Sequence, residues 1–227
     1  SRFPNLGSFA IDASSTIKYI ESQGPISGEA PAQNIICKFK GGGKPNSLAK
    51  LAAVATCFSA LTIEDCNTKN LKGVELFTNV AHLWFENSIF HLRTFLPIAH
   101  QIETVKFQDS TLKSPHLWSH FTAINTFKTL SFNNHKRGLK KLENIMPLRH
   151  QIKRLSILDD LKDEENIDQF SCLEVLNTQF IPFRIAKKIL SMPTLKKLSF
   201  SIWTKKKRTL NLGKLTQLEH LQVTGNE

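Results

Sequence analysis

The residues with the clearest chemical potential are a glycine-rich segment, three evenly spaced histidines, a carboxylate cluster and four cysteines. The segment KGGGKPNS, residues 40–47, resembles a phosphate-binding loop, whose glycines let backbone amides cradle a phosphate. That motif requires a glycine five residues before Gly43, where this chain has Lys38, and Pro45 removes a backbone donor. We therefore interpret the segment as a flexible loop that leads to Ser47, the predicted N-cap of a helix.

The histidines and carboxylates match no known metal or catalytic pattern. His82, His91 and His100 are nine residues apart, a spacing that suits no compact zinc site, and no HExxH sequence accompanies them. We expect them on a strand, a return segment and a loop, respectively. The acidic run LDDLKDEEN, residues 158–166, is typical of a solvated loop, and no GxSxG elbow occurs. The sequence therefore predicts no catalytic residue, metal ligand or cofactor, and an enzyme ranks third among the functions considered.

The cysteines and the composition bound the class of protein. Cys37, Cys57, Cys66 and Cys172 include no CxxC pair, which favours free thiols in a reducing compartment, the cytoplasm or the nucleus. No apolar run reaches eighteen residues and no signal peptide is visible, so no membrane insertion is predicted. The net charge of +11 fits either a polyanionic partner or simple solubility.

Cys66 ends the stretch FSALTIEDC, residues 58–66, and this pattern recurs along the chain. Successive copies start 22, 22, 25, 25, 21, 22 and 23 residues apart. The copies from Phe58 onward begin at Phe58, Val80, Ile102, Phe127, Ile152, Leu173, Leu195 and Leu218. Weaker copies begin at Leu6 and Ile36, and an insertion near residues 21–34, rich in glycine and proline, separates them.

This pattern resembles the leucine-rich-repeat family, whose unit is LxxLxLxxN/C-x-L over 20 to 29 residues. The resemblance covers residues 58–227 and, more loosely, residues 1–57. It implies an α/β solenoid of about nine repeats, a curved horseshoe with parallel strands on its concave face and helical or irregular segments on its convex face. Cys66 stands where the family places a buried Asn or Cys, so we predict that it packs rather than reacts. The same position holds Ser14, Ser88, Ser110 and Asn226.

Some copies depart from the unit, and the ends lack caps. Thr178 stands where a third apolar residue is expected, and His135 and Asp160 occupy the Asn/Cys position. Residues 47–57 and 183–192 have apolar spacing typical of helices on the convex side. We interpret residues 1–227 as one repeat domain. Because neither end carries a polar capping unit, we expect a fragment of a longer chain.

Alternate strand residues face away from the core and form the predicted protein-binding surface. The family's common role implies a non-catalytic module, a monomer, that binds another protein through its concave face. Trp84 is either an interface anchor or a residue packed against its concave neighbours. The predicted binding residues are Glu64, His82, Trp84, Glu86, Lys106, Gln108, Thr129, Ser131, Asn133, Arg154, Ser156, Asn177, Lys197 and Ser199.

Two settings and one alternative function fit the sequence. Similar solenoids are effectors that intracellular bacteria deliver into the host cytoplasm, or substrate receptors of F-box ubiquitin ligases. Richness in Asn, Lys, Ile and Phe and the lack of an F-box segment favour the effector. The alternative is nucleic-acid binding through a basic rim of two loops at corresponding repeat positions. The rim residues are Lys136, Arg137, Lys140, Lys141, Lys205, Lys206, Lys207 and Arg208.

Overall fold

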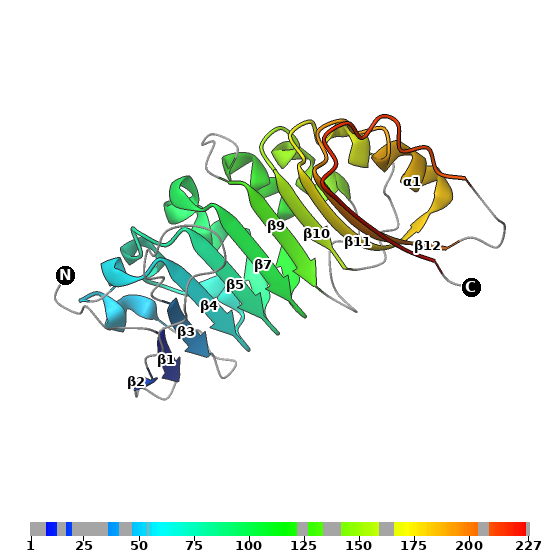
Figure 1. Ribbon diagram of the computed structural model, residues 1–227. Helices are drawn as coiled ribbons and strands as arrows, with labels where there is room; N and C mark the ends of the chain where they lie inside the picture. Colours follow the sequence, from blue (N-terminus) through cyan, green and yellow to red (C-terminus); the bar gives the residue numbers. More distant parts are fainter. Residues whose placement is uncertain are drawn as a thin grey trace. The chain divides into compact units, whose positions relative to one another are not determined.

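A computed structural model describes residues 8–12, 17–19, 36–40, 47–53, 55–121, 127–133, 142–158, 166–203 and 209–225. It contains two compact units, an N-terminal unit (Ser1–Ser114) and a C-terminal unit (Pro115–Glu227). Each unit is built from parallel strands alternating with short return segments (Figure 1). No helix among the described residues is long and apolar enough to cross a membrane.

The strands of the N-terminal unit stack in chain order without offset. Leu61 of one strand lies beside Leu83 of the next, and Leu83 lies beside Val105. A short strand, β2 (Ile17–Tyr19), pairs antiparallel to the first strand, an addition that the repeat does not predict. The parallel strands are β1 (Ser8–Asp12), β3 (Ile36–Lys40), β4 (Ala60–Glu64), β5 (His82–Glu86) and β7 (Thr104–Gln108). The two weak copies near the start are therefore confirmed as strands.

The C-terminal unit repeats this arrangement. Leu130, Leu155, Leu176, Leu198 and Leu221 occupy one row across its strands. In the large sheet, every strand from β4 onward begins two residues after the start of its copy, so the predicted register is confirmed. The strands are β9 (Thr129–Asn133), β10 (Arg154–Ile157), β11 (Val175–Pro182), β12 (Lys197–Trp203) and β13 (His220–Gly225).

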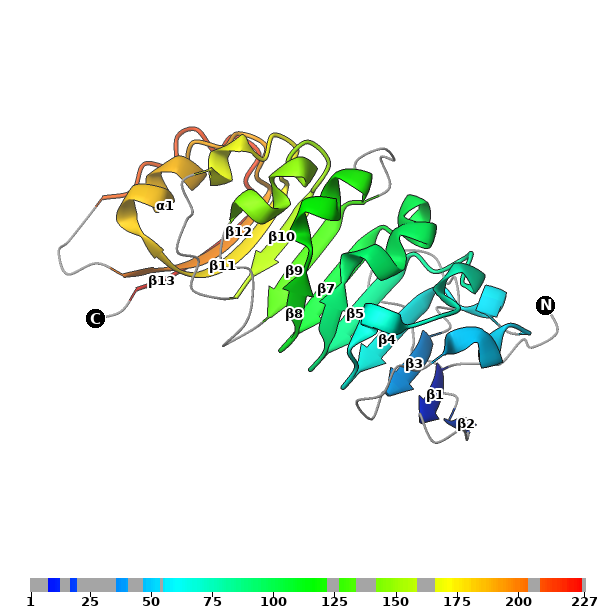
Figure 2. The ribbon, with the colours of Figure 1, turned by 180° about the vertical axis from the view of Figure 1, so that it is seen from behind.

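The return segments lie along one face of each unit's strands (Figure 2). The predicted helix at 183–192 is present as α1 (Phe183–Ile189), with Ile185 and Ile189 buried. The predicted helix at 47–57 is instead two short 3₁₀ turns, although Ser47 caps the first as expected. The 3₁₀ helices are η1 (Leu48–Leu51), η2 (Ala55–Cys57), η3 (Thr68–Asn70), η4 (Val74–Leu76), η5 (Leu92–Gln101), η6 (Pro115–Phe121), η7 (Leu142–Leu148) and η8 (Ile167–Gln169).

The 3₁₀ form has a physical reason. A 3₁₀ helix rises about 2 Å per residue against about 1.5 Å for an α-helix, so a short return segment in this form covers more of the strand length. Proline inside η5 and η7, at Pro97 and Pro147, also removes a backbone donor that a regular α-helix would use.

Aromatic side chains fill the space between strands and return segments. Phe85 and Phe107 face each other on neighbouring strands with ring centroids 5.5 Å apart, and Phe90 approaches Phe85 to 4.2 Å. In the C-terminal unit, the rings of Trp118 and Phe121 are 5.1 Å apart. Aromatic pairs of this kind add about 0.5–1.5 kcal/mol each beyond the burial of their area. Of these three contacts, that between Phe85 and Phe107 joins successive repeats, and the other two each lie within one repeat.

A repeated turn after β4, β5 and β7 explains Cys66. Asp65, Asn87 and Asp109, the residues that follow these strands, all have positive φ, between 45° and 49°. The next residue is buried in each case. The Ser88 hydroxyl accepts a hydrogen bond from the Cys66 amide at 3.1 Å, and the Ser110 hydroxyl accepts one from the Ser88 amide at 3.0 Å.

The turn also orders a second, smaller sheet. It contains β6 (Ile89–His91) and β8 (Thr111–Lys113), whose amides at Ile89 and Thr111 donate to the carbonyls of Cys66 and Ser88. Cys66 is 3% exposed, so the prediction that it packs in the turn is confirmed. Ser14, His135, Asp160 and Asn226, which hold the equivalent position elsewhere, lie outside the described residues.

A β-bulge explains how the strand accommodates Thr178, which stands where the repeat unit has an apolar residue. Asn177 pairs with Ser199, but the next paired residue of β11 is Phe180, which lies opposite Ser201. The extra residue reverses the alternation that follows, so Ile181 points into the core and Phe180 points out. Ile181 supplies the apolar contact that Thr178 does not.

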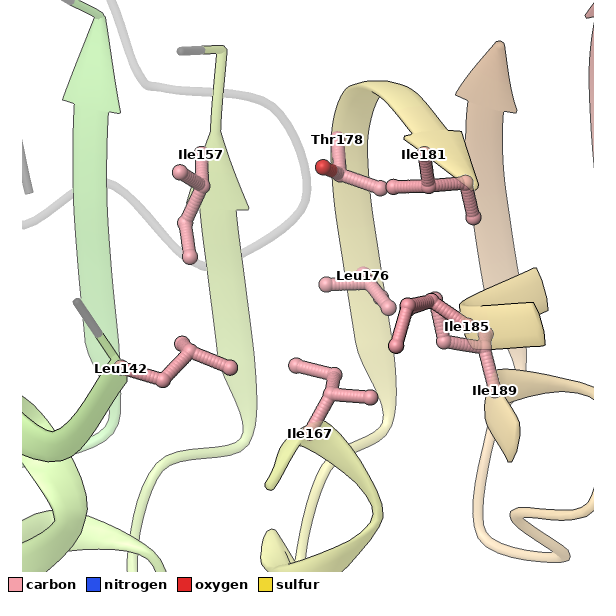
Figure 3. Close-up of a pocket in the computed structure, with 8 residues that line it drawn as sticks. All are labelled: Leu142, Ile157, Ile167, Leu176, Thr178, Ile181, Ile185 and Ile189. Carbon is pink, nitrogen blue, oxygen red and sulfur yellow. The ribbon is translucent and has the colours of Figure 1, made fainter. Parts of the chain in front are cut away.

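Thr178 itself is buried and lines a small, almost wholly apolar cavity of the C-terminal unit (Figure 3). The other lining residues come from the neighbouring strand, the return segments and β11 itself. They are Leu142, Ile157, Ile167, Leu176, Ile181, Ile185 and Ile189.

A charge in the shared core should unfold the C-terminal unit. Leu130 is completely buried, so Leu130→Asp places an unpaired carboxylate among apolar side chains and should cost about 3–5 kcal/mol of unfolding free energy. Ser131→Asp, one residue further on the opposite face, should cost less than about 1 kcal/mol. Denaturant titration followed by circular dichroism measures both. Equal stability of the two variants would show that the register is wrong.

Cys66 should react slowly with alkylating reagents in the folded protein. Burial raises the pKa of its thiol to about 11, so little thiolate, the reactive form, exists at mildly alkaline pH. Exposed Cys57 provides an internal control in the same molecule. Mass spectrometry of peptides after native and denatured alkylation should show Cys66 labelled only after unfolding. Native labelling of Cys66 as fast as that of Cys57 would contradict its burial.

Candidate functional site

The candidate site consists of the strand residues that face away from the return segments. On β5, β7 and β9 these residues alternate strictly with buried ones. We call the outward residues of β4, β5 and β7 the N-terminal open face, and those of β9 to β13 the C-terminal open face. All the binding residues predicted from the sequence are exposed or half-buried at outward positions. They are Glu64, His82, Trp84, Glu86, Lys106 and Gln108 in the first face, and Thr129, Ser131, Asn133, Arg154, Ser156, Asn177, Lys197 and Ser199 in the second.

Trp84 lies near the centre of the N-terminal open face. The ammonium group of Lys106, on the neighbouring strand, stands 5.3 Å from the centre of its ring. This is a cation–π contact, which is worth about 0.5–1 kcal/mol at an exposed position. Trp84 therefore packs against a neighbour on this face, while its half-buried ring keeps part of its surface accessible.

Ala60 and Thr62 differ from the expectation that all outward residues are accessible. They are 2% and 4% exposed, although they alternate with the core residues Leu61 and Ile63. Thr62 lies beside Trp84 in the strand register, so a small side chain sits next to a large one. The Thr62 hydroxyl and the Trp84 indole nitrogen are both buried, and neither has a hydrogen-bond partner among the described residues.

Protonation of His82, on the N-terminal open face, is disfavoured. Burial lowers the pKa of His82; Glu103 partly opposes this and Lys106 adds to it. His82 lies on β5, as predicted. His91 ends β6, and its pKa is also lowered, by burial and by Lys69 and Lys113. His100 lies in η5 rather than in the predicted loop.

The C-terminal open face is polar at its centre and basic where the strands begin. Ser131, Ser156, Asn177 and Ser199 form one row across four neighbouring strands. Arg154 and Lys197 are exposed at the first outward positions of β10 and β12. Lys153 and Lys196, one residue earlier, both bind Glu174, at 3.0 and 3.1 Å.

Phe180 is a residue of this face that the sequence analysis missed. Its side chain is 44% exposed, large for an aromatic group on a strand. Strict alternation assigns it to the core, and only the bulge turns it outward. The signal in the sequence was the polar Thr178 at an expected core position, which indicated an irregular strand but not its direction.

Several predicted features lie outside the described residues. These are the basic rim (Lys136, Arg137, Lys140, Lys141, Lys205, Lys206, Lys207 and Arg208), most of the loop at 40–47 and the acidic residues 159–165. Within the described ranges, no group of three or more His, Cys, Asp or Glu side chains could hold a metal ion.

Comparison with known proteins shows the fold but not the family. No family model matches the sequence, and no curated protein matches it. The structure is similar to an internalin, a leucine-rich-repeat protein, from Listeria monocytogenes, with a TM-score of 0.51 and 13% sequence identity. The match covers 84% of this chain and 53% of the internalin chain, so this chain spans about half the length of that protein. The predicted leucine-rich-repeat fold is thereby confirmed.

Protonation of His82 should weaken folding in mild acid. Its pKa in the folded protein lies below the ordinary value of about 6.5, so the neutral form is favoured by the fold. The stability that depends on neutral His82 is complete above that ordinary value and is lost as the pH falls through the folded pKa. His82→Gln should therefore reduce the loss of unfolding free energy between neutral and mildly acidic pH. An exposed histidine, His116, replaced in the same way, is the control. An identical pH dependence for wild type and His82→Gln would contradict this account.

Proposed function

We propose that this chain is a non-catalytic module, monomeric, that binds a partner protein through its open faces. The observation that carries the proposal is the pair of regular strand arrays that display varied side chains outward at fixed positions. The backbone of each strand is already held by its neighbours. Little backbone entropy is therefore lost when a partner binds these side chains. Fold likeness to an internalin supports a binding role only by analogy.

Trp84 is the proposed anchor of the N-terminal open face. Tryptophan is enriched among the residues that dominate binding energy, because a large ring is ordered at low entropic cost. Lys106 already restrains one side of the ring, which pre-organises it for contact. Glu64, His82, Glu86 and Gln108 provide the surrounding polar contacts in this proposal.

The biological setting is also a proposal. We favour a bacterial effector that acts in the cytoplasm of a host cell. The composition of the chain supports this setting, and the structural neighbour is a bacterial protein. The alternative setting is the substrate receptor of a ubiquitin ligase. Identification of the captured partner separates them, since a ligase receptor must also bind the ligase core.

A second candidate function is nucleic-acid binding, which the eight basic residues of the rim favour. A phosphate backbone bound there would release counterions, so affinity would fall steeply as salt rises. Reversing the charge of Lys205, Lys206, Lys207 and Arg208 would abolish such binding, whereas Trp84→Ala would leave it unchanged.

We expect Trp84→Ala to weaken binding of the partner protein by about 2 kcal/mol, as the loss of an anchor residue does. The partner is captured with the intact gene product, and its dissociation constant is then measured for wild type and variant by calorimetry. His116→Ala, at an exposed position of the return segment η6, is the control.

Charge reversal in the rim should mainly slow association and change its salt dependence. Salt-sensitive binding to DNA or RNA of any sequence, unaffected by Trp84→Ala, would refute protein recognition in favour of the second candidate.

A further inference from the structure

The C-terminal open face carries three different rows of side chains. The strands pair in parallel without offset up to the bulge, so outward residues at equal positions lie side by side across the sheet. The row at the strand starts contains Thr129, Arg154, Val175, Lys197 and His220, and the middle row Ser131, Ser156, Asn177, Ser199 and Gln222. The third row contains Asn133, Phe180, Ser201 and Thr224, and Leu158 follows β10 on the same side.

The first row is basic, and the described strands of this face carry no carboxylate at their outward positions. Arg154, Lys197 and His220 are exposed. Glu174, the acidic residue just before β11, is occupied by Lys153 and Lys196, whose hydrogen bonds lower its pKa. Arg154 and Lys197 make no ion pair with the described residues, so their charge is available to a ligand.

The middle row consists of short polar side chains. Ser131, Ser156 and Asn177 are half-buried, and their side chains make no hydrogen bond to any described residue. Small side chains between a basic row and an aromatic one leave a shallow strip lined with free donors and acceptors. A chain in extended conformation has main-chain groups that suit such a strip.

Phe180 supplies an apolar contact on the far side of this strip. Its neighbour in the register is Ser201, which hydrogen-bonds to Thr224, so the ring stands beside small side chains. A ring that is 44% exposed beside small polar residues has apolar surface that a partner can cover.

We propose that the C-terminal open face binds an extended acidic segment of a partner protein, with carboxylates on Arg154 and Lys197 and an apolar side chain on Phe180. This inference rests on the proposed function and adds the chemistry of the partner. The basic row and the level of Phe180 are about four strand residues, or about 13 Å, apart. For a ligand segment that runs parallel to the strands and crosses the middle row, the acidic and apolar residues are therefore separated by about four residues of extended chain.

A protein segment fits this face better than a nucleic acid does. A nucleic-acid strand carries a phosphate on every nucleotide and is bound along a track of basic groups. Here the basic side chains are confined to the first row, and the described residues of the other two rows are neutral.

The test uses random peptides displayed on phage and selected on the whole chain. The selected peptides should be enriched in Asp and Glu, with a large apolar residue about four positions away. The strongest binder is then synthesised with a fluorescent label, and its dissociation constant is measured by fluorescence anisotropy. The double variant Arg154→Glu/Lys197→Glu should weaken it about tenfold or more, with a reduced salt dependence. Phe180→Ser should weaken it about tenfold.

Matched controls lie in the same unit, away from the strands. Leu212 is 42% exposed, close to Phe180, so Leu212→Ser removes a similar apolar group from the surface. Lys214→Glu reverses an exposed charge in a turn. Neither control should change the affinity. All the variants replace exposed side chains, and circular dichroism verifies that they fold.

Four results would overturn the inference. Selected peptides without enrichment in Asp and Glu would contradict the proposed binding of an acidic segment. Binding that is insensitive to both test variants would contradict it as well. If peptide or partner binding depends on Trp84→Ala alone, the proposed function stands and this inference fails. A single-stranded oligonucleotide probe that the charge reversal displaces, but Phe180→Ser does not affect, would assign the basic row to nucleic acid instead.

Discussion

Contact between neighbouring repeats is the interaction on which the rest of this structure depends. One short strand and one return segment expose an apolar side that a single repeat cannot bury, so each repeat is stable only when the next one covers it. Backbone hydrogen bonds hold this contact at the start of each strand. The Lys153 carbonyl accepts from the amides of Glu174 and Val175, and the Glu174 carbonyl accepts from those of Lys196 and Lys197. The same double acceptance recurs in both units.

Polar groups in the turns also stabilise the stacking of neighbouring repeats, because a buried amide without a hydrogen-bond partner costs about 1–3 kcal/mol. The Ser88 hydroxyl satisfies the amide of Cys66, and Gln101 donates to the carbonyl of Val80 in the preceding repeat. Each bond spans about one repeat, so it forms only when neighbouring repeats are in register. Hydrogen bonding and apolar burial therefore select the same stacking.

Regular stacking also produces the surfaces proposed for binding. Once one face of every strand is committed to the core, the opposite side chains are free to vary without cost to the fold. The side chains of the two open faces differ. The N-terminal open face has carboxylates and a tryptophan restrained by Lys106, and the C-terminal open face has a basic row, a row of short polar side chains and Phe180. Partners of different chemistry are the expected consequence.

The sequence by itself determined the repeat, the strand positions and the core. A period near 22 residues is a local property, and the alternation within each copy assigns inward and outward residues without knowledge of any contact. This alternation places Leu130 and Leu155 in the core and Cys66 in the turn after its strand, and all three are buried. The outward positions of the candidate site follow from the same alternation, whereas their partner does not.

Tertiary structure decided the features that depend on two strands at once. Phe180 points outward because β11 contains one residue more than β12 can pair with, a mismatch that alternation within one strand does not reveal. Thr62 is buried, although its strand position is outward, in a row that it shares with the much larger Trp84. In both cases the deciding contact is with the strand of a neighbouring repeat, which no single repeat contains.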